Sequence, residues 1–370
     1  MKAKFLFPLF ALLAMMGACQ GTPDNGGENN GDLLAGKITL IVDHEFIRAN
    51  GSEAASFTVL LQDNSGMFHD VTADSDIYIA GNDTPIEGSK FTTESTGSWT
   101  FYALYGLEVS NEVGVSAVAG IADIPADPKP ESTDFHHRIL LLQHTGTACP
   151  NCPRVMSDLK KLSEDSAYNT RYNHVASHSY NSDDPAHSSA ADVLSRALSV
   201  MLYPWVTFNL TEANAVELSG IKRNIDEIHR PKADVGIALS VSNVDGKIYA
   251  NVAVKAAKSG NYRMSVWVLE DGIVASQSGA NASWQNTHNN ALREMVGENR
   301  NERIYGKNIG TIEAGKTYET LVGVELDSEW VASCCEVMII VTTDDGKGGY
   351  DAVNTAVCTV GESYAFEYNN

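Results

Sequence analysis

Residues 138–153 read RILLLQHTGTACPNCP, and this stretch decides the fold of the central part of the chain. Arg138–Gln143 is an almost wholly apolar run, which is typical of a strand buried on both faces. Residues 154–164 follow with three apolar residues at helical spacing, Val155, Leu159 and Leu162. The intervening segment 145–153 therefore joins a buried strand to the start of a helix.

That junction carries the pair Cys149 and Cys152 in a C-x-x-C motif, which is the thioredoxin-like redox arrangement. The free N–H groups and the positive dipole end of the helix stabilise a thiolate, so Cys149 is the expected catalytic nucleophile and Cys152 the resolving thiol. Two alternatives stay open. The pair could be a permanent structural disulfide of an exported protein, or half of a metal site, because six of the ten histidines lie between residues 136 and 187. We assign no metal ligand.

The sequence after the motif continues an α/β pattern. It predicts a strand at 173–177 and helices at 186–200 and 218–229. Tyr203 and Pro204 directly precede a further apolar strand. In thioredoxin-like folds a cis-proline at this place lies opposite the C-x-x-C, and the backbone beside it pairs with an extended substrate. Tyr203 and Pro204 are thus the expected substrate-binding residues; the alternative is a trans-proline that merely begins a strand.

The N-terminus has the features of an export signal. Residues 1–18 combine two lysines with an apolar run too short to span a membrane. Met16-Gly17-Ala18-Cys19 resembles the bacterial lipobox, so we expect lipidation at Cys19; the alternative is an ordinary secretory signal with a chance cysteine. Residues 19–36 are rich in Gly, Asn, Asp and Glu, as in a flexible tether.

The rest of the chain favours β-structure. Residues 37–120 alternate short apolar runs with turns, which predicts an antiparallel β-sandwich resembling bacterial immunoglobulin-like repeats. Residues 121–135 form a Pro-rich linker, 136–232 the thioredoxin-like domain, and 233–370 a C-terminal β-sandwich. The predicted fold class is therefore multidomain and mainly β, with one α/β domain.

Composition excludes several functions. The chain has 370 residues, 26 Lys+Arg against 47 Asp+Glu, and a net charge of -21 without a basic run. This charge argues against nucleic acid as a partner. No G-x-G-x-x-G, P-loop, H-E-x-x-H or G-x-S-x-G motif is present, so we expect no cofactor. Three further cysteines, Cys334, Cys335 and Cys358, lie in predicted strands where a cross-strand disulfide is plausible.

Together these motifs resemble the outer-membrane-protein-28-related lipoproteins of the Gram-negative envelope over residues 136–370. His288-Asn289-Asn290-Ala291-Leu292-Arg293 is similar to that family's His-Asn-His-x-x-Arg element, with Asn290 at the place of its second histidine. His144 and Ala148 depart from the usual residues around the motif, and we expect both to open or polarise the surface near Cys149. The resemblance implies an outer membrane lipoprotein that faces the periplasm or the cell surface.

Two functions follow from these observations. The chain could be an enzyme, a lipid-anchored thiol–disulfide oxidoreductase acting on envelope proteins or peptides through Cys149 and Cys152. It could instead be a binding or structural lipoprotein in which the C-x-x-C is a structural disulfide. In both, the membrane is a partner only through the lipid anchor at Cys19.

Overall fold

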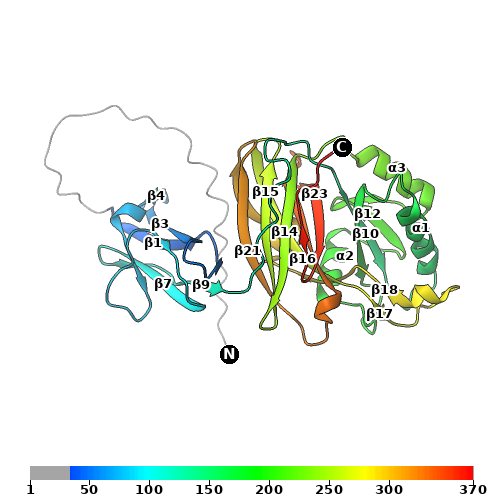
Figure 1. Ribbon diagram of the computed structural model, residues 1–370, viewed down its shortest axis with the longest axis horizontal. Helices are drawn as coiled ribbons and strands as arrows, with labels where there is room; N and C mark the ends of the chain where they lie inside the picture. The colour runs from blue at the N-terminus through cyan, green and yellow to red at the C-terminus, as the bar shows by residue number, and fades with distance from the viewer. Residues whose placement is uncertain (1–33, 370) are drawn as a thin grey trace. The chain divides into compact units, whose positions relative to one another are not determined.

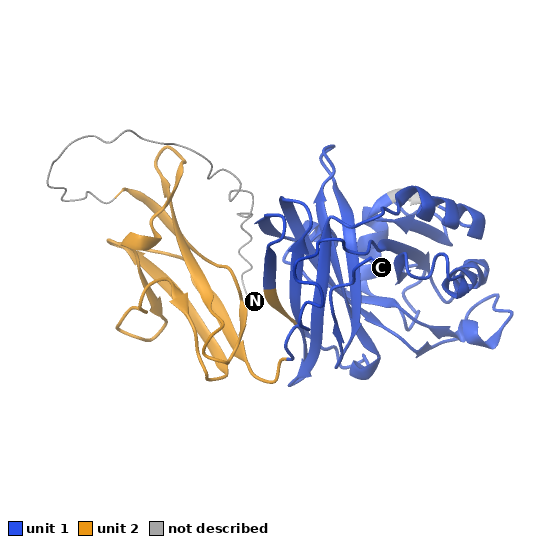
Figure 2. Cartoon of the chain, turned by 45° about the horizontal axis from the view of Figure 1, so that its top comes forward, with its two compact units in different colours: residues 1–13, 122–319, 324–370 blue, residues 14–121, 320–323 orange. Residues whose placement is uncertain are grey.

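The computed structural model describes residues 34–369. The described chain forms two compact units (Figure 2): one comprises residues 34–121 with 320–323, and the other comprises 122–319 and 324–369. The predicted signal peptide 1–18, the lipidation site Cys19 and most of the predicted tether lie outside the described residues.

The smaller unit consists of two sheets around one core. Phe57, Leu61 and Phe101 are among the buried side chains that the two sheets share. The first sheet contains β1 (Gly36–Val42), β3 (Ala55–Asp63), β4 (Phe68–Asp70) and β6 (Lys90–Phe91). The second contains β2 (Phe46–Arg48), β5 (Asp76–Ile79), β7 (Gly97–Tyr105), β8 (Glu108–Val109) and β9 (Val113–Val118). The unit is thus a β-sandwich, and its likeness to immunoglobulin-like repeats stays a prediction.

The larger unit is built on a nine-stranded sheet with the order β13-β12-β10-β11-β19-β16-β22-β23, in which β20 also pairs with β16. Its strands are β10 (Ile139–Thr145), β11 (Tyr172–His178), β12 (Trp205–Phe208), β13 (Thr211–Asn214), β16 (Gly260–Glu270), β19 (Ala291–Met295), β20 (Lys307–Ile312), β22 (Cys335–Asp344) and β23 (Tyr350–Thr359). A second sheet has the order β21-β15-β14-β24, with β14 (Val235–Val244), β15 (Lys247–Ala256), β21 (Thr317–Glu325) and β24 (Ser363–Tyr364). A small ladder joins β17 (Ile273–Val274) to β18 (Thr287–His288). Strands dominate both units, so the predicted mainly β, multidomain class is confirmed.

Strand β10 is buried along its whole length, as its apolar sequence predicts. Successive side chains of a strand point to opposite faces of the sheet. Ile139 and Leu141 accordingly pack with α1 (Cys152–Glu164) and α3 (Leu218–Ile228), whereas Leu140 and Leu142 pack with α2 (Ser189–Ala197). The helices therefore cover both faces of this end of the sheet (Figure 1).

Local sequence explains where these helices begin. Pro153 lies in the first turn of α1, where a missing N–H costs nothing. Ser188 caps α2 by accepting a hydrogen bond from the Ala191 N–H at 3.1 Å. The apolar residues predicted on the inner face of α1, Val155, Leu159 and Leu162, are all buried.

The sheet runs continuously through segments that the sequence analysis treats as separate domains. Strand β19 lies beside β11 in parallel, with Ala176 opposite Ala291 and the Ala176 N–H donating to the Asn290 carbonyl at 2.8 Å. Residues 136–232 and 233–369 thus share one sheet and, apart from residues 320–323, one compact unit. The predicted domain boundaries themselves stay a prediction.

The segment expected as a linker, 121–135, packs on the larger unit from Ala122 onward. The Ser240 hydroxyl donates to the Ala122 carbonyl at 2.7 Å, and the Lys255 ammonium pairs with Asp127 at 2.9 Å. Phe135 is fully buried. These contacts tie most of the Pro-rich segment to the second sheet.

The expected cross-strand disulfide in the C-terminal part is wrong. Cys334, Cys335 and Cys358 are free thiols. In the β22–β23 hairpin, a bulge shifts the register and Cys358 lies opposite Val337. Cys335 and Cys358 are therefore diagonal neighbours, a separation too large for a disulfide bond.

Candidate functional site: the covered disulfide

Cys149 and Cys152 form a disulfide, with their Cα atoms 5.5 Å apart. Cys152 is the first residue of α1, and the Cys152 N–H donates to the Cys149 carbonyl in the turn that precedes the helix. The motif thus lies between β10 and α1, where the sequence predicts it. Whether the pair is catalytic stays a prediction.

Both cysteines are buried. Cys149 is 1% exposed and Cys152 0%, although Pro150 and Asn151 between them are exposed. A segment from the C-terminal part of the chain contacts the backbone of the motif: residues 275–286, which connect β17 to β18 and are called the cover segment below. The buried motif is therefore in contact with residues more than 120 positions away in the sequence.

Gln277 is the main polar contact of the cover segment. Its side-chain amide Nε2 lies 3.3, 3.2 and 3.0 Å from the carbonyl oxygens of Gly146, Thr147 and Cys149. The Ser278 N–H also donates to the Thr147 carbonyl, at 2.7 Å. The polypeptide that leads into the motif is therefore hydrogen-bonded directly to the cover.

Two more contacts close the cover over the start of α1. Gly279 has a φ of +72°, and a Cβ there would lie 2.3 Å from the Pro150 carbonyl oxygen, so only glycine fits. The Gln285 amide donates to the Pro153 carbonyl at 2.8 Å and to the Ser157 hydroxyl at 3.1 Å. The cover thus contacts the motif on both sides of the disulfide.

The predicted substrate-binding residues lie at the same end of the sheet as the disulfide. The Tyr203–Pro204 peptide bond is cis, as expected. Pro204 precedes β12, whose Trp205 lies opposite His144 near the end of β10. The Tyr203 hydroxyl is 2.9 Å from the Ser179 hydroxyl. Binding of a substrate by Tyr203 and Pro204 stays a prediction.

The expected effect of His144 on the surface is wrong. His144 is fully buried, and its two ring nitrogens lie 3.0 Å from the Ser195 hydroxyl and 3.1 Å from the Thr207 hydroxyl. Burial lowers the pKa of His144 to about 3, so its ring is neutral at pH 7. Successive side chains of β10 alternate between the two faces of the sheet. The His144 side chain therefore points to the face opposite that of Gln143 and Thr145, where it faces α2.

A buried His–Asp pair anchors the loop between β10 and the motif. Asp184 accepts hydrogen bonds from the Thr147 N–H at 2.7 Å and from His178 Nδ1 at 2.8 Å. Burial alone would raise the pKa of Asp184, but the hydrogen bond from His178 and the backbone bonds outweigh it and lower that pKa. The ring of His288 packs edge-on against His178, with 5.0 Å between ring centroids.

The His-Asn-Asn element mainly holds loops in place. His288 Nε2 donates to the Ala275 carbonyl at 3.2 Å, and the Asn289 side chain accepts the Gly272 N–H at 2.8 Å. Arg293 pairs with the buried Glu270 at 2.6 Å. Asn290 has a φ of 55°, a conformation that asparagine tolerates better than most residues.

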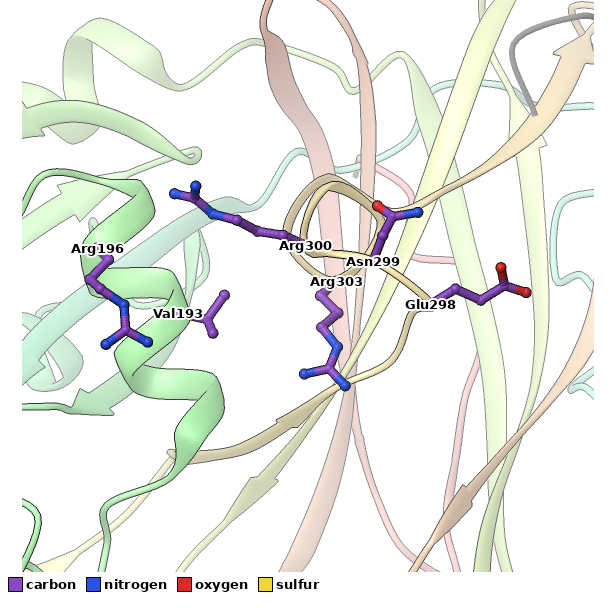
Figure 3. Close-up of a pocket in the computed structure, with 6 residues that line it drawn as sticks. All are labelled: Val193, Arg196, Glu298, Asn299, Arg300 and Arg303. Atoms are coloured by element: carbon purple, nitrogen blue, oxygen red, sulfur yellow. The ribbon is translucent and has the colours of Figure 1, made fainter. Parts of the chain in front are cut away.

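A basic pocket of about 510 Å³ lies elsewhere in the larger unit. Its lining includes Arg196 on α2, Arg300 and Arg303 on α4 (Arg300–Tyr305), and Glu298, whose side chain points away from the three arginines (Figure 3). Two of the three guanidinium groups have partners: Arg303 donates to the Gly297 carbonyl, and Arg196 lies 3.8 Å from Asp192.

Within residues 34–369, no cluster of three or more His, Cys, Asp or Glu side chains has a geometry suited to a metal ion. The same part of the chain contains no helix that is both long and apolar enough to cross a membrane.

Residues 191–363 match the model of the family described as outer membrane protein Omp28. The resemblance to this family that the sequence predicts is thereby confirmed for that region. The description of this family agrees with the expected place of the chain in the cell envelope. The matched region begins after the C-x-x-C motif and does not include it. No protein with a curated description matches the chain.

Among solved structures, HBP35 of Porphyromonas gingivalis is similar to 63% of this chain and 78% of its own, with 14% identity and a TM-score of 0.53. At this identity the likeness concerns the fold alone. Domains 4–9 of the surface layer protein SbsC align with 91% of this chain and 51% of their own, at 11% identity, but the TM-score of 0.18 carries no argument.

Sequence reasoning found the disulfide and the proline but missed the cover. Gln277 and Gln285 lie in a segment without apolar periodicity, and nothing in the local sequence connects them to Cys149. Asp184 was missed for the same reason. The glycine at 279, next to a serine, marks a turn in the sequence but not what the turn contacts.

Proposed function

We propose that this chain is a lipid-anchored binding protein of the bacterial outer membrane, in which the Cys149–Cys152 disulfide is a structural clip. One observation carries the proposal: both cysteines are buried, and the cover segment is hydrogen-bonded to the backbone on either side of them. The family match supports a place in the envelope.

Burial bears directly on the chemistry of exchange. A disulfide is reduced when an external thiolate reaches one of its sulfur atoms, so exchange depends on access to the sulfur. In this structure Cys149 is 1% exposed, so an attacking thiol reaches its sulfur only after a local movement of the surrounding residues. A clip that stabilises the start of α1 needs no such access.

The test is a redox titration of the full chain, in which alkylated Cys149 and Cys152 are counted by mass spectrometry. For a structural clip we expect the pair to stay oxidised below about -300 mV. A reversible transition between about -270 and -120 mV is typical of catalytic pairs and would contradict the proposal.

Stability gives a second readout. A disulfide that closes a four-residue loop lowers the conformational entropy of the unfolded chain, which raises the free energy of unfolding by about 2 kcal/mol. The double variant Cys149→Ser/Cys152→Ser should lose about that much free energy of unfolding. The matched control is Cys334→Ser, which removes a thiol that has no disulfide partner. Partner binding should survive in both variants.

A second candidate function is thiol–disulfide exchange on envelope proteins or peptides, and a surface feature favours it. Met201 and Leu202 are exposed apolar residues directly before Tyr203, and Tyr180, also exposed, packs against the Tyr203 ring with centroids 5.3 Å apart. An extended peptide could dock on this apolar edge.

In that mechanism the Cys149 thiolate of the reduced protein attacks a substrate disulfide, forms a mixed disulfide and releases one substrate thiolate. Cys152 then attacks Cys149, which releases the second substrate thiolate and leaves the Cys149–Cys152 disulfide. The variant Cys152→Ser should accumulate the mixed disulfide, and Cys149→Ser should not. Absence of any mixed disulfide in cells producing Cys152→Ser would exclude this function.

The anchor is tested separately. Cys19→Ala should release the chain from the membrane fraction, and the N-terminal peptide of the protein without this substitution should carry the mass of a diacylated cysteine. Protease treatment of intact cells then distinguishes the cell surface from the periplasm.

A further inference from the structure

The basic pocket between α2 and α4, called the arginine pocket here, combines a large volume with an unusual charge. Its volume of about 510 Å³ is within the range of small-molecule sites. Such sites are mostly apolar, whereas the lining here is mostly polar and charged. It consists of Val193, Arg196, Glu298, Asn299, Arg300 and Arg303. A ligand of this pocket is therefore recognised by charge and hydrogen bonds rather than by apolar contact.

Packing of two helices on one core brings the three arginines together. Leu194 of α2 and Ile304 of α4 belong to the same buried cluster. Arg300 and Arg303 are three positions apart, so they lie on the same side of α4. Arg196 lines the pocket from α2, and the side chain of Arg300 extends from α4 toward α2 (Figure 3). The guanidinium groups thus border one pocket from two helices.

These positive charges are poorly neutralised, although the chain has a net charge of -21. Arg196 lies 3.8 Å from Asp192, a long and largely exposed ion pair that contributes little. Within residues 34–369, Arg300 has no ion-pair partner. Glu298 lines the pocket, but its side chain points away from the three arginines (Figure 3). Grouped like charges repel one another, so a bound anion would stabilise this arrangement.

Arginines elsewhere in the larger unit have close carboxylate partners. Arg138 pairs with Glu367 at 2.8 Å, and Arg293 pairs with Glu270 at 2.6 Å. The chain thus neutralises other arginines with its own carboxylates, and the arginine pocket differs from them in this respect.

Arg303 is held in place before any ligand binds. Its carbonyl accepts hydrogen bonds from Trp267 Nε1 and from the Ser265 hydroxyl, both at 2.9 Å, and Trp267 is fully buried. Its side-chain Nε donates to the Gly297 carbonyl at 3.2 Å, which leaves the two terminal amino groups of the guanidinium for a ligand. A donor that is already ordered loses less conformational freedom on binding.

We propose that the arginine pocket binds a small polyanion that carries two or more phosphate groups. A phosphate monoester has about 1.5 to 2 negative charges at pH 7 and three strong acceptor oxygens. The planar guanidinium fork binds such oxygens in pairs. Two phosphate groups therefore balance three arginines, whereas one carboxylate balances a single arginine. The inference goes beyond the function proposed above, because it assigns a ligand class to a pocket that the disulfide does not line.

The test for a soluble ligand is isothermal titration calorimetry of the full chain in a phosphate-free buffer without divalent cations. Two matched pairs are compared: fructose 1,6-bisphosphate with fructose 6-phosphate, and pyrophosphate with phosphate. For a soluble ligand we expect at least one of the two compounds with two phosphate groups to bind at least tenfold more tightly than its monophosphate partner.

The second arm tests a lipid headgroup as the source of the phosphates. Phosphatidylcholine vesicles containing diphosphoryl lipid A are compared with vesicles containing monophosphoryl lipid A. The lipid anchor contributes equally to both, so only the difference in affinity reports on the pocket. If the headgroup is the ligand, the diphosphoryl vesicles should bind at least tenfold more tightly. Equal affinity within every pair of both arms, or no binding at millimolar concentration in either, would overturn the proposal.

Variants assign the binding to the arginine pocket. Arg300→Gln should weaken binding at least tenfold and leave the melting temperature of the unliganded protein unchanged or higher, because Arg300 is exposed and unpaired. Arg300→Lys keeps the charge but not the fork, so its affinity should be intermediate. The control is Arg223→Gln, at an exposed position on α3 with the same change in net charge, and it should leave the affinity unchanged. Equal losses in Arg300→Gln and Arg223→Gln would show binding through overall charge, and an unchanged affinity of Arg300→Gln would also contradict the assignment.

The two proposals fail separately. A catalytic redox potential for Cys149 and Cys152 would overturn the structural clip without altering the calorimetry. Failure of the phosphate compounds and of the vesicles to bind would overturn the ligand class while leaving the redox result unchanged.

Discussion

Replacing one side chain should expose the disulfide. Gln277→Glu keeps the size of the side chain but replaces the amide that donates to the Gly146, Thr147 and Cys149 carbonyls with a carboxylate that cannot donate. If the cover segment protects the disulfide, this change should favour its open state.

The magnitude follows from the hydrogen-bond count. The Gln277 amide has two hydrogens, so about two good bonds are lost, each worth about 1 kcal/mol net. The substituted carboxylate also faces three carbonyl oxygens, which repel it and add to this loss. The closed state of the cover segment is therefore destabilised by at least about 2 kcal/mol relative to the open state. The reduction rate follows the population of the open cover when opening and closing are fast. Since 1.4 kcal/mol corresponds to a factor of ten, reduction should be about 30-fold faster.

The assay is the rate of reduction by a phosphine, followed by alkylation and mass spectrometry, at pH 7.5 and pH 4. The closed cover disfavours the charged carboxylate, so the pKa of the substituted carboxyl is raised in the closed state. Protonation at low pH restores one donor, and the difference from the unsubstituted protein should therefore shrink at pH 4. Gln277→Ala should show no such pH effect.

The matched control is Gln62→Glu, at an exposed position on β3 of the smaller unit. It should leave the rate unchanged. A rate for Gln277→Glu within twofold of the unsubstituted protein would refute the idea that the cover protects the disulfide.

Three further predictions concern the rate of disulfide reduction and the stability of the fold. Gly279→Ala should destabilise the closed cover segment and speed reduction of the disulfide at least tenfold, because the added Cβ collides with the Pro150 carbonyl. An unchanged rate would show that the cover segment accommodates the Cβ and would contradict this prediction. Burial lowers the pKa of His144 to about 3, so this residue binds a proton more readily in the unfolded chain than in the folded one. The contribution of His144 to the free energy of unfolding is therefore complete above about pH 6.5 and falls as the pH drops toward 3. His144→Gln should flatten this fall by up to about 1.4 kcal/mol per pH unit in urea denaturation, and an identical slope would contradict the assignment. Lys255→Ala should cost about 3 kcal/mol in the same assay, since it leaves the Asp127 carboxylate without its buried partner; a loss under about 1 kcal/mol would contradict this.

Local features were predictable where the determining interactions are close in sequence. The apolar run of β10, the helix after Cys152 and the strand after Pro204 follow from side-chain periodicity and from proline geometry. The His144 prediction failed because strand alternation turned its ring toward α2, where Ser195 and Thr207 bind it. The cross-strand disulfide failed because the register of the β22–β23 hairpin, set by its turn and by a bulge between Val341 and Thr342, places Cys358 opposite Val337 rather than opposite Cys335.

By itself, the sequence determined the mainly β class, the strand–motif–helix order around Cys149 and the likeness to the Omp28 family, because short-range patterns encode each of them. Only the tertiary structure decided that the disulfide is covered and that β11 and β19 share a sheet. It also decided that Arg196, Arg300 and Arg303 line one pocket. These features depend on pairings between segments far apart in the chain, and such pairings come from the packing of whole strands and loops rather than from any local pattern.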